Sequence, residues 1–315
     1  MIWLRAARRR YRASPWRRLV EFAILGLSLA LMAHALILNL SQIDFAGLRF
    51  DISYLLAALF AAWVALWIGA FAWAEIVRAL CPDVPYLQLL KYHLLSTITK
   101  YLPGLGWMQV SKAIQLHRSG VPLRRTTVAL FLEVGLVILT GLALAAQIVS
   151  SMPERILGVT FYHPLLRFGI PILLWGVCVT VPFVLFRFVL RRTFTPTERR
   201  RLALHLWSAQ LLQLVGWLVL GAAFWLMGNT IFDLSLNLIP YCVVAIVISF
   251  VVSLIVIIVP NGLGIRELTM STLFQVIMPV AVAVTVALMS RAVLVVAELL
   301  GALPVVFASA IRRNP

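Results

Sequence analysis

Five charged residues lie within otherwise apolar stretches of the sequence: Lys100, Glu133, Arg266, Glu267 and Arg291. An isolated charge inside a lipid bilayer costs at least about 2.5–3.5 kcal/mol, so each of them needs a partner, water or a ligand. Three of the five are cations, and cations of this kind bind phosphate groups. We therefore expect these residues to bind an anion, such as a phosphate group.

Catalytic and metal-binding patterns are not visible. The sequence has no Ser/His/Asp set, nucleotide-binding glycine loop or paired-carboxylate signature, and its three cysteines and five histidines lack metal-ligand spacing. We predict a protein that is not an enzyme and that uses no cofactor and no metal.

Two Pro/Gly breaks, at residues 103–106 and 260–264, adjoin these charges. Backbone groups freed by such breaks persist at membrane depth only where protein or a wet cavity satisfies them. Residues 107–118 and 265–278 follow the breaks as predicted half-helices, whose positive N-terminal ends attract anions. Arg266 lies at one such start, and an Arg266–Glu267 pair that satisfies itself stays open as an alternative. The predicted binding site comprises Lys100, Pro103, Gly104, Gly106, Trp107, Glu133, Gly262, Gly264, Arg266, Glu267 and Arg291.

The two breaks belong to an internal repeat. The triplet at residues 104–106 recurs 158 residues later at 262–264, and Glu133 and Arg291 each lie 29 residues beyond the first glycine of their triplet. At 1.5 Å per residue, both charges lie roughly 12–17 Å deep in their helices, near the bilayer centre. We expect them to pair with each other, with Glu298 as a competing partner of Arg291. A structural clasp between the repeats and a role in headgroup binding or gating both remain open.

The elements that position these residues are membrane helices. Of the 315 residues, 63% are hydrophobic and only 12% charged, and the mean hydropathy is +1.01, which excludes an ordinary soluble or disordered protein. A spanning helix needs about 20 apolar residues. Six predicted spans cover residues 19–40, 52–77, 126–149, 168–186, 202–227 and 280–311.

Two further apolar segments, 86–102 and 238–259, run into the breaks, and we interpret them as the first arms of re-entrant hairpins. On this interpretation, 21 of the 27 Lys and Arg residues lie on one side, which the positive-inside rule identifies as cytoplasmic. The sequence thus predicts an all-α, polytopic membrane protein. A basic cytoplasmic N-terminus (1–18) precedes one transmembrane domain (19–311), and a cytoplasmic tail (312–315) follows it. Two repeats of opposite orientation, about 52–190 and 202–311, form the inverted plan of many transporters. The net charge of +16 comes mostly from basic residues that indicate the cytoplasmic side of the membrane, and we expect no nucleic-acid binding.

At these motifs the sequence resembles the lysylphosphatidylglycerol synthase transmembrane family. Residues 100–107, Gly120 to Pro122 and Glu133 are similar to its first signature, and residues 260–267 with Ser290 and Arg291 to its second. Trp107 and Gln109 stand where the commonest first signature has Gly-Glu, and a Trp-containing form occurs in members linked to glycan or lipid pathways. The resemblance implies a protein similar to the flippase portion of the multiple peptide resistance factor, which moves aminoacylated phospholipid between leaflets. The full-length relatives add a soluble domain that transfers the amino acid from charged tRNA; we expect this chain to lack that domain and its synthase activity.

The leading hypothesis is a lipid flippase of a bacterial or archaeal inner membrane. It would move an anionic or modified phospholipid, or a lipid-linked glycan, through a midplane site. The alternative is a non-transporting partner or regulator of a glycosyltransferase or lipid-modifying enzyme, which would dock on the basic cytoplasmic face. A third hypothesis is an intramembrane glycosyltransferase with Glu267 or Glu133 as its base. Self-association into a homo-oligomer remains open.

Overall fold

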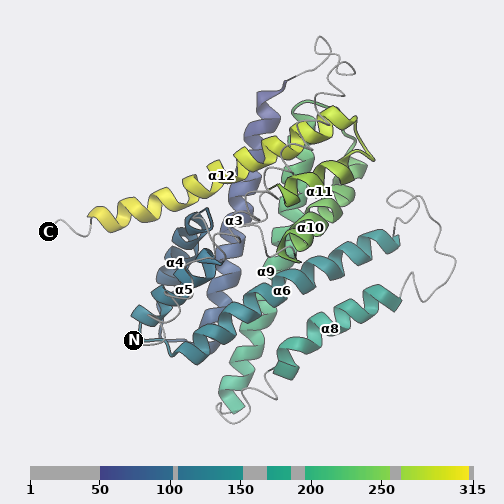
Figure 1. Ribbon diagram of the computed structural model, residues 1–315. Helices are drawn as coiled ribbons and strands as arrows, with labels where there is room; N and C mark the ends of the chain where they lie inside the picture. The colour runs from purple at the N-terminus through teal and green to yellow at the C-terminus, as the bar shows by residue number, and fades with distance from the viewer. Residues whose placement is uncertain (1–49, 102–105, 152–168, 186–195, 256–263, 312–315) are drawn as a thin grey trace, which may run out of the picture.

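The computed structural model describes residues 50–101, 106–151, 169–185, 196–255 and 264–311. The described ranges are helical and contain no strand, which confirms the predicted all-α class (Figure 1). The basic N-terminus, the predicted span at 19–40, and Pro103, Gly104 and Gly262 lie outside the described residues.

The described helices follow the predicted segments closely. They are α3 (Ile52–Leu80), α4 (Tyr86–Thr99), α5 (Trp107–Arg118), α6 (Leu123–Ser151), α8 (Ile170–Leu185), α9 (Pro196–Asn229), the 3-10 turn η4 (Leu236–Leu238), α10 (Ile239–Ile255), α11 (Ile265–Phe274) and α12 (Val280–Ile311).

Five of the described helical segments are long and apolar enough to cross a membrane. These are Ile52–Leu80, Leu123–Ser151, Arg200–Asn229, Leu236–Ile255 and Val280–Pro304. The protein is therefore a multi-pass membrane protein, as predicted. Helix α8, expected as a span, has 16 described residues, or about 24 Å at 1.5 Å per residue, less than the ~30 Å hydrocarbon core. The segment formed by η4 and α10 has the length to cross fully, so its re-entrant path stays a prediction.

The helix contacts fall into two matching sets, α3–α6 and α9–α12. Within each set every helix packs on the next: α3 on α4, α4 on α5 and α5 on α6, and likewise from α9 to α12. Between the sets, α3 packs on α9; α12 contacts α3 and α4, while α6 contacts α9 and α10. Each of these contacts has its counterpart when the two sets are exchanged. Figure 1 shows the two helix pairs that flank the Pro/Gly breaks, α4–α5 and α10–α11, on either side of α3.

The two half-helices begin at equivalent glycines. Gly106 precedes α5 with φ of 72° and Gly264 precedes α11 with φ of 81°, and the two positions are 158 residues apart. A positive φ strains any residue with a Cβ, which explains why both breaks end in glycine. The predicted starts at Trp107 and Ile265 are therefore confirmed, and α11 ends at Phe274, four residues before its predicted end.

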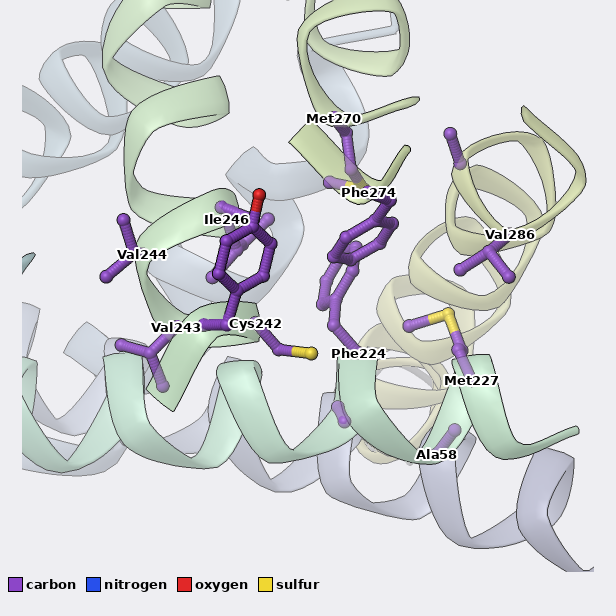
Figure 2. Close-up of a cluster of buried hydrophobic side chains, with 14 of the residues drawn as sticks. Ala58, Phe224, Met227, Cys242, Val243, Val244, Ile246, Met270, Phe274 and Val286 are labelled. Carbon is purple, nitrogen blue, oxygen red and sulfur yellow. The ribbon is translucent and has the colours of Figure 1, made fainter. Parts of the chain in front are cut away.

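A buried apolar cluster holds α10 and α11 against α9 and α12. The rings of Phe224 on α9 and Phe274 on α11 lie 6.5 Å apart and pack with Met227, Cys242 and Met270 (Figure 2). This packing fixes the position of α11, whose first turn carries Arg266 and Glu267.

Helices α9 and α10 approach each other closely at Gly221. A Cβ there would lie 2.2 Å from Val243 Cγ2 and 2.9 Å from its Cα, and close approach through small residues is the usual basis of helix packing in membranes. We predict that Gly221→Ala lowers the free energy of unfolding by about 1–3 kcal/mol, the usual cost of overpacking. SDS-induced unfolding of the purified protein measures it. Gly135→Ala on α6, where a Cβ meets nothing within 4 Å, is the control and should cost nothing.

Candidate functional site

The charges predicted at membrane depth lie in two clusters rather than one. The first, called here the Lys112 cluster, comprises His93 on α4, Lys112 on α5 and Glu133 on α6, with Trp73 of α3 beside them. The second, called the Glu298 cluster, comprises Lys100 and Tyr101 at the end of α4, Arg266 and Glu267 on α11, and Arg291 and Glu298 on α12.

The Lys112 cluster is closed off from its surroundings. The side chain of Lys112 is 0% exposed and donates a hydrogen bond to Glu133 Oε1 in an ion pair. Its ammonium lies 4.5 Å from the centre of the Trp73 ring, a cation–π contact. His93 Nδ1 lies 3.7 Å from Glu133 Oε1, too far for a hydrogen bond. Both His93 Nδ1 and Glu133 Oε2 are buried and have no partner within the described part of the chain.

The expected pairing of Glu133 with Arg291 is wrong. Glu133 pairs with Lys112 on the preceding half-helix α5, and Arg291 lies 3.4 Å from Glu267 on its own preceding half-helix α11. Each deep charge is thus neutralised within its own half, so neither needs the other. Glu298, expected as a competitor for Arg291, pairs instead with Lys100.

The Glu298 cluster joins the two halves of the molecule. Lys100 donates to Glu298 Oε1, and the Tyr101 hydroxyl donates to Oε2 at 2.9 Å, so both oxygens of this buried carboxylate are occupied. The Tyr101 ring contacts two cations: Lys100 Nζ lies 5.3 Å and the Arg291 guanidinium carbon 5.4 Å from its centre. An ion pair, a hydrogen bond and a cation–π contact therefore connect the end of α4 to α12.

The start of α11 is organised around Glu267. The amide of Gly264 donates to Glu267 Oε2 at 2.8 Å, and Arg291 Nη1 donates to Oε1 at 3.4 Å. The second nitrogen of Arg291, Nη2, is buried and has no hydrogen-bond partner among the residues that the structure describes. Arg266 is half-buried within electrostatic range of Glu267, Arg291 and Glu298 and forms no ion pair with the residues that the structure describes. The Arg266–Glu267 pair left open above is therefore not formed.

This second cluster has the chemistry of an anion site. Three cations (Lys100, Arg266 and Arg291) face two carboxylates (Glu267 and Glu298), which leaves one positive charge in excess. The unpartnered Arg291 donor and the first turn of α11, whose amides lack helical acceptors, both favour a phosphate oxygen. Across the described residues no group of three or more His, Cys, Asp or Glu is placed to hold a metal ion.

Of the predicted glycines and the tryptophan, Gly106 is exposed at the start of α5, Trp107 is half-buried beside it, and Gly264 is buried. Four contributors were not among the predicted site residues: His93, Tyr101, Lys112 and Glu298. The 21 basic residues that the sequence places on the cytoplasmic side include Lys112, and the structure buries its side chain completely. The sequence holds no clear signal for it, because the apolar residues Val110 and Ile114 of α5 are exposed, whereas Lys112 and Leu116 are buried.

Comparison with known proteins agrees with this architecture. No curated protein matches the chain. A family model, described as the lysylphosphatidylglycerol synthase TM region, matches residues 23–301. That range includes every described residue of both clusters. The chain therefore belongs to the lysylphosphatidylglycerol synthase transmembrane family, a family of lipid-related membrane proteins.

Proposed function

We propose that this protein is a lipid flippase, and that it moves an anionic or modified phospholipid, or a lipid-linked glycan, between membrane leaflets without altering it chemically. The lipid phosphate binds Arg291, Arg266 and Lys100 at the Glu298 cluster. The observation that carries the proposal is the buried, unpartnered Nη2 of Arg291 in a cluster with excess positive charge. A buried donor of this kind costs about 1–3 kcal/mol until an acceptor arrives.

The position of the cluster between the two halves supports transport rather than static binding. Lys100 and Tyr101 come from the first half, and Glu298 and Arg291 from the second. A lipid phosphate that engages residues of both halves changes the contacts between them, as alternating access through an inverted repeat requires. The matching helix contacts of the two halves support this repeat, and the bias of basic residues supports a bacterial inner-membrane protein with both termini in the cytoplasm.

The test is transbilayer movement of labelled phosphatidylglycerol in liposomes that contain the purified protein. We predict movement above that of protein-free liposomes, and a fall of about 10- to 100-fold in Arg291→Gln, because a charge-assisted hydrogen bond contributes about 1.5–3 kcal/mol. Glutamine keeps a donor toward Glu267 but removes the charge. Chemical quenching of the label in the outer leaflet measures the rate.

The matched control is Arg118→Gln. Arg118 is an exposed arginine at the end of α5, and its replacement should leave the rate unchanged. Equal rates in protein-free liposomes and in liposomes with the wild-type protein, across anionic and aminoacylated lipids, would overturn the proposal. In that case a role as partner or regulator of a lipid-modifying enzyme gains support.

A further inference from the structure

We propose that His93, together with Lys112 and Glu133, is a proton-binding site, and that it is coupled to the anion site at the Glu298 cluster. The coupling rests on the proposed function; the proton site itself rests on the Lys112 cluster alone.

The Lys112 cluster contains polar atoms that the folded chain leaves unused. His93 and Glu133 are each 6% exposed. Across the described ranges, no hydrogen-bond partner reaches the buried atoms His93 Nδ1, Glu133 Oε2 and Trp73 Nε1. Burial without a partner costs about 1–3 kcal/mol for each such group. A proton added to the imidazole makes both ring nitrogens donors, so that Nδ1 can hydrogen-bond Glu133 after a shift of less than 1 Å from its present 3.7 Å.

The burial of the imidazole, first, and then the charges around it decide when the proton binds to His93. On α4 itself the neighbour is Lys100, α5 contributes Lys112, and α6 contributes Glu133. From α3 the cluster receives the uncharged Trp73, and α12, which also packs on α4, carries Glu298 in its pair with Lys100. Two cations therefore oppose the proton, and the one carboxylate beside the imidazole is already shared with Lys112.

An anion bound at the Glu298 cluster changes this balance. Lys100 belongs to that cluster and caps α4 seven residues beyond His93, about 10 Å along the same helix, so its positive charge opposes a further positive charge at His93. A phosphate beside Lys100 offsets its charge, and electrostatic interactions are strong in a poorly solvated interior. The anion thus raises the proton affinity of His93. By thermodynamic reciprocity, the proton raises the affinity for the anion by the same factor.

The experiment measures proton uptake when phosphatidylglycerol binds to the purified full-length protein in neutral detergent micelles. A pH-sensitive dye reports uptake in weakly buffered solution, and phosphatidylcholine, which has no net charge, is the comparison lipid. We expect up to one proton per phosphatidylglycerol, and an affinity that rises up to about tenfold per pH unit as the pH falls. His93→Gln should abolish the uptake, whereas His117→Gln, which changes an exposed histidine on α5, should retain it.

Binding of phosphatidylglycerol without proton uptake, or equal uptake in the wild type and in His93→Gln, would overturn the inference. Where His93→Gln fails to fold, Glu133→Gln replaces it, because the amide still accepts from Lys112 but no longer offers a negative charge to a protonated His93. Absence of any preference for phosphatidylglycerol contradicts the proposed function and the coupling. In that case acid–base titration of the ligand-free protein decides the proton site separately, since His93→Gln should bind one proton fewer than the wild type.

Discussion

Lys112→Met should lower the free energy of unfolding by about 3–5 kcal/mol, because it leaves the Glu133 carboxylate charged and buried without its partner. Methionine nearly matches the length and volume of the lysine side chain, so little of the loss should come from packing. The cation–π contact with Trp73 disappears as well. SDS-induced unfolding in detergent micelles, followed by circular dichroism, measures the difference.

The double variant Lys112→Met with Glu133→Leu separates charge from packing. Replacing a whole buried ion pair with apolar residues of similar size is often neutral or stabilising, by up to about 4 kcal/mol. We therefore expect the double variant to regain most of the stability that the single variant loses. A single variant as stable as the wild type would contradict the buried pair, and a double variant no better than the single one would show that shape, not charge, sets the loss.

The sequence alone was enough to predict the helices and the starts of both half-helices. Apolar runs about as long as a bilayer is thick predicted α3, α6, α9 and α12. Gly106 and Gly264 predicted where α5 and α11 begin, because a Pro/Gly break cannot continue a helix and a positive φ favours glycine.

The partners of the deep charges could not be predicted in this way. Depth along a helix follows from residue counting, and by that measure Glu133 and Arg291 were suitable partners. Pairing also depends on lateral distance and on helix rotation, which depth does not determine. Lys112 was missed for a related reason: α5 is polar enough to be taken for a solvated helix, and only its packing against α4 and α6 buries the lysine.

The two halves have matching helix contacts, but the charged residues of their ion pairs do not match. In each, the half-helix after the break is joined by an ion pair to the long helix that follows it, Lys112 to Glu133 and Glu267 to Arg291. The signs are reversed, and the half-helix charges differ in register by one turn: at the 158-residue offset Lys112 corresponds to Met270, and Glu267 to Gln109. Among the described residues, the first half thus leaves Glu133 Oε2 without a partner, and the second leaves Arg291 Nη2 without one. This asymmetry supports a proton at one site and an anion at the other.

Exchanging the charges of Lys100 and Glu298 should restore the fold without restoring transport. Lys100→Glu alone places two carboxylates together at a buried contact, and we expect a loss of about 3–5 kcal/mol in the free energy of unfolding and no measurable lipid movement. Lys100→Glu combined with Glu298→Lys re-forms the ion pair and should regain most of that stability. Unfolding in SDS and movement of labelled phosphatidylglycerol are measured on the same preparations.

The exchange distinguishes a purely structural ion pair from a ligand-binding site. A structural pair needs only opposite charges at positions 100 and 298, whereas a bound phosphate needs the positive charge at position 100. In the wild type Lys100 donates to Glu298, and on the proposed mechanism it exchanges this partner for the lipid phosphate. After the exchange, the end of α4 presents a carboxylate that repels the phosphate, although the cluster keeps its total charge. Transport should therefore stay at least about tenfold below that of the wild type, which corresponds to the loss of about 1.4 kcal/mol of binding. Full recovery of transport would mean that Lys100 and Glu298 serve only to join α4 to α12, and that Arg266 and Arg291 bind the phosphate without them.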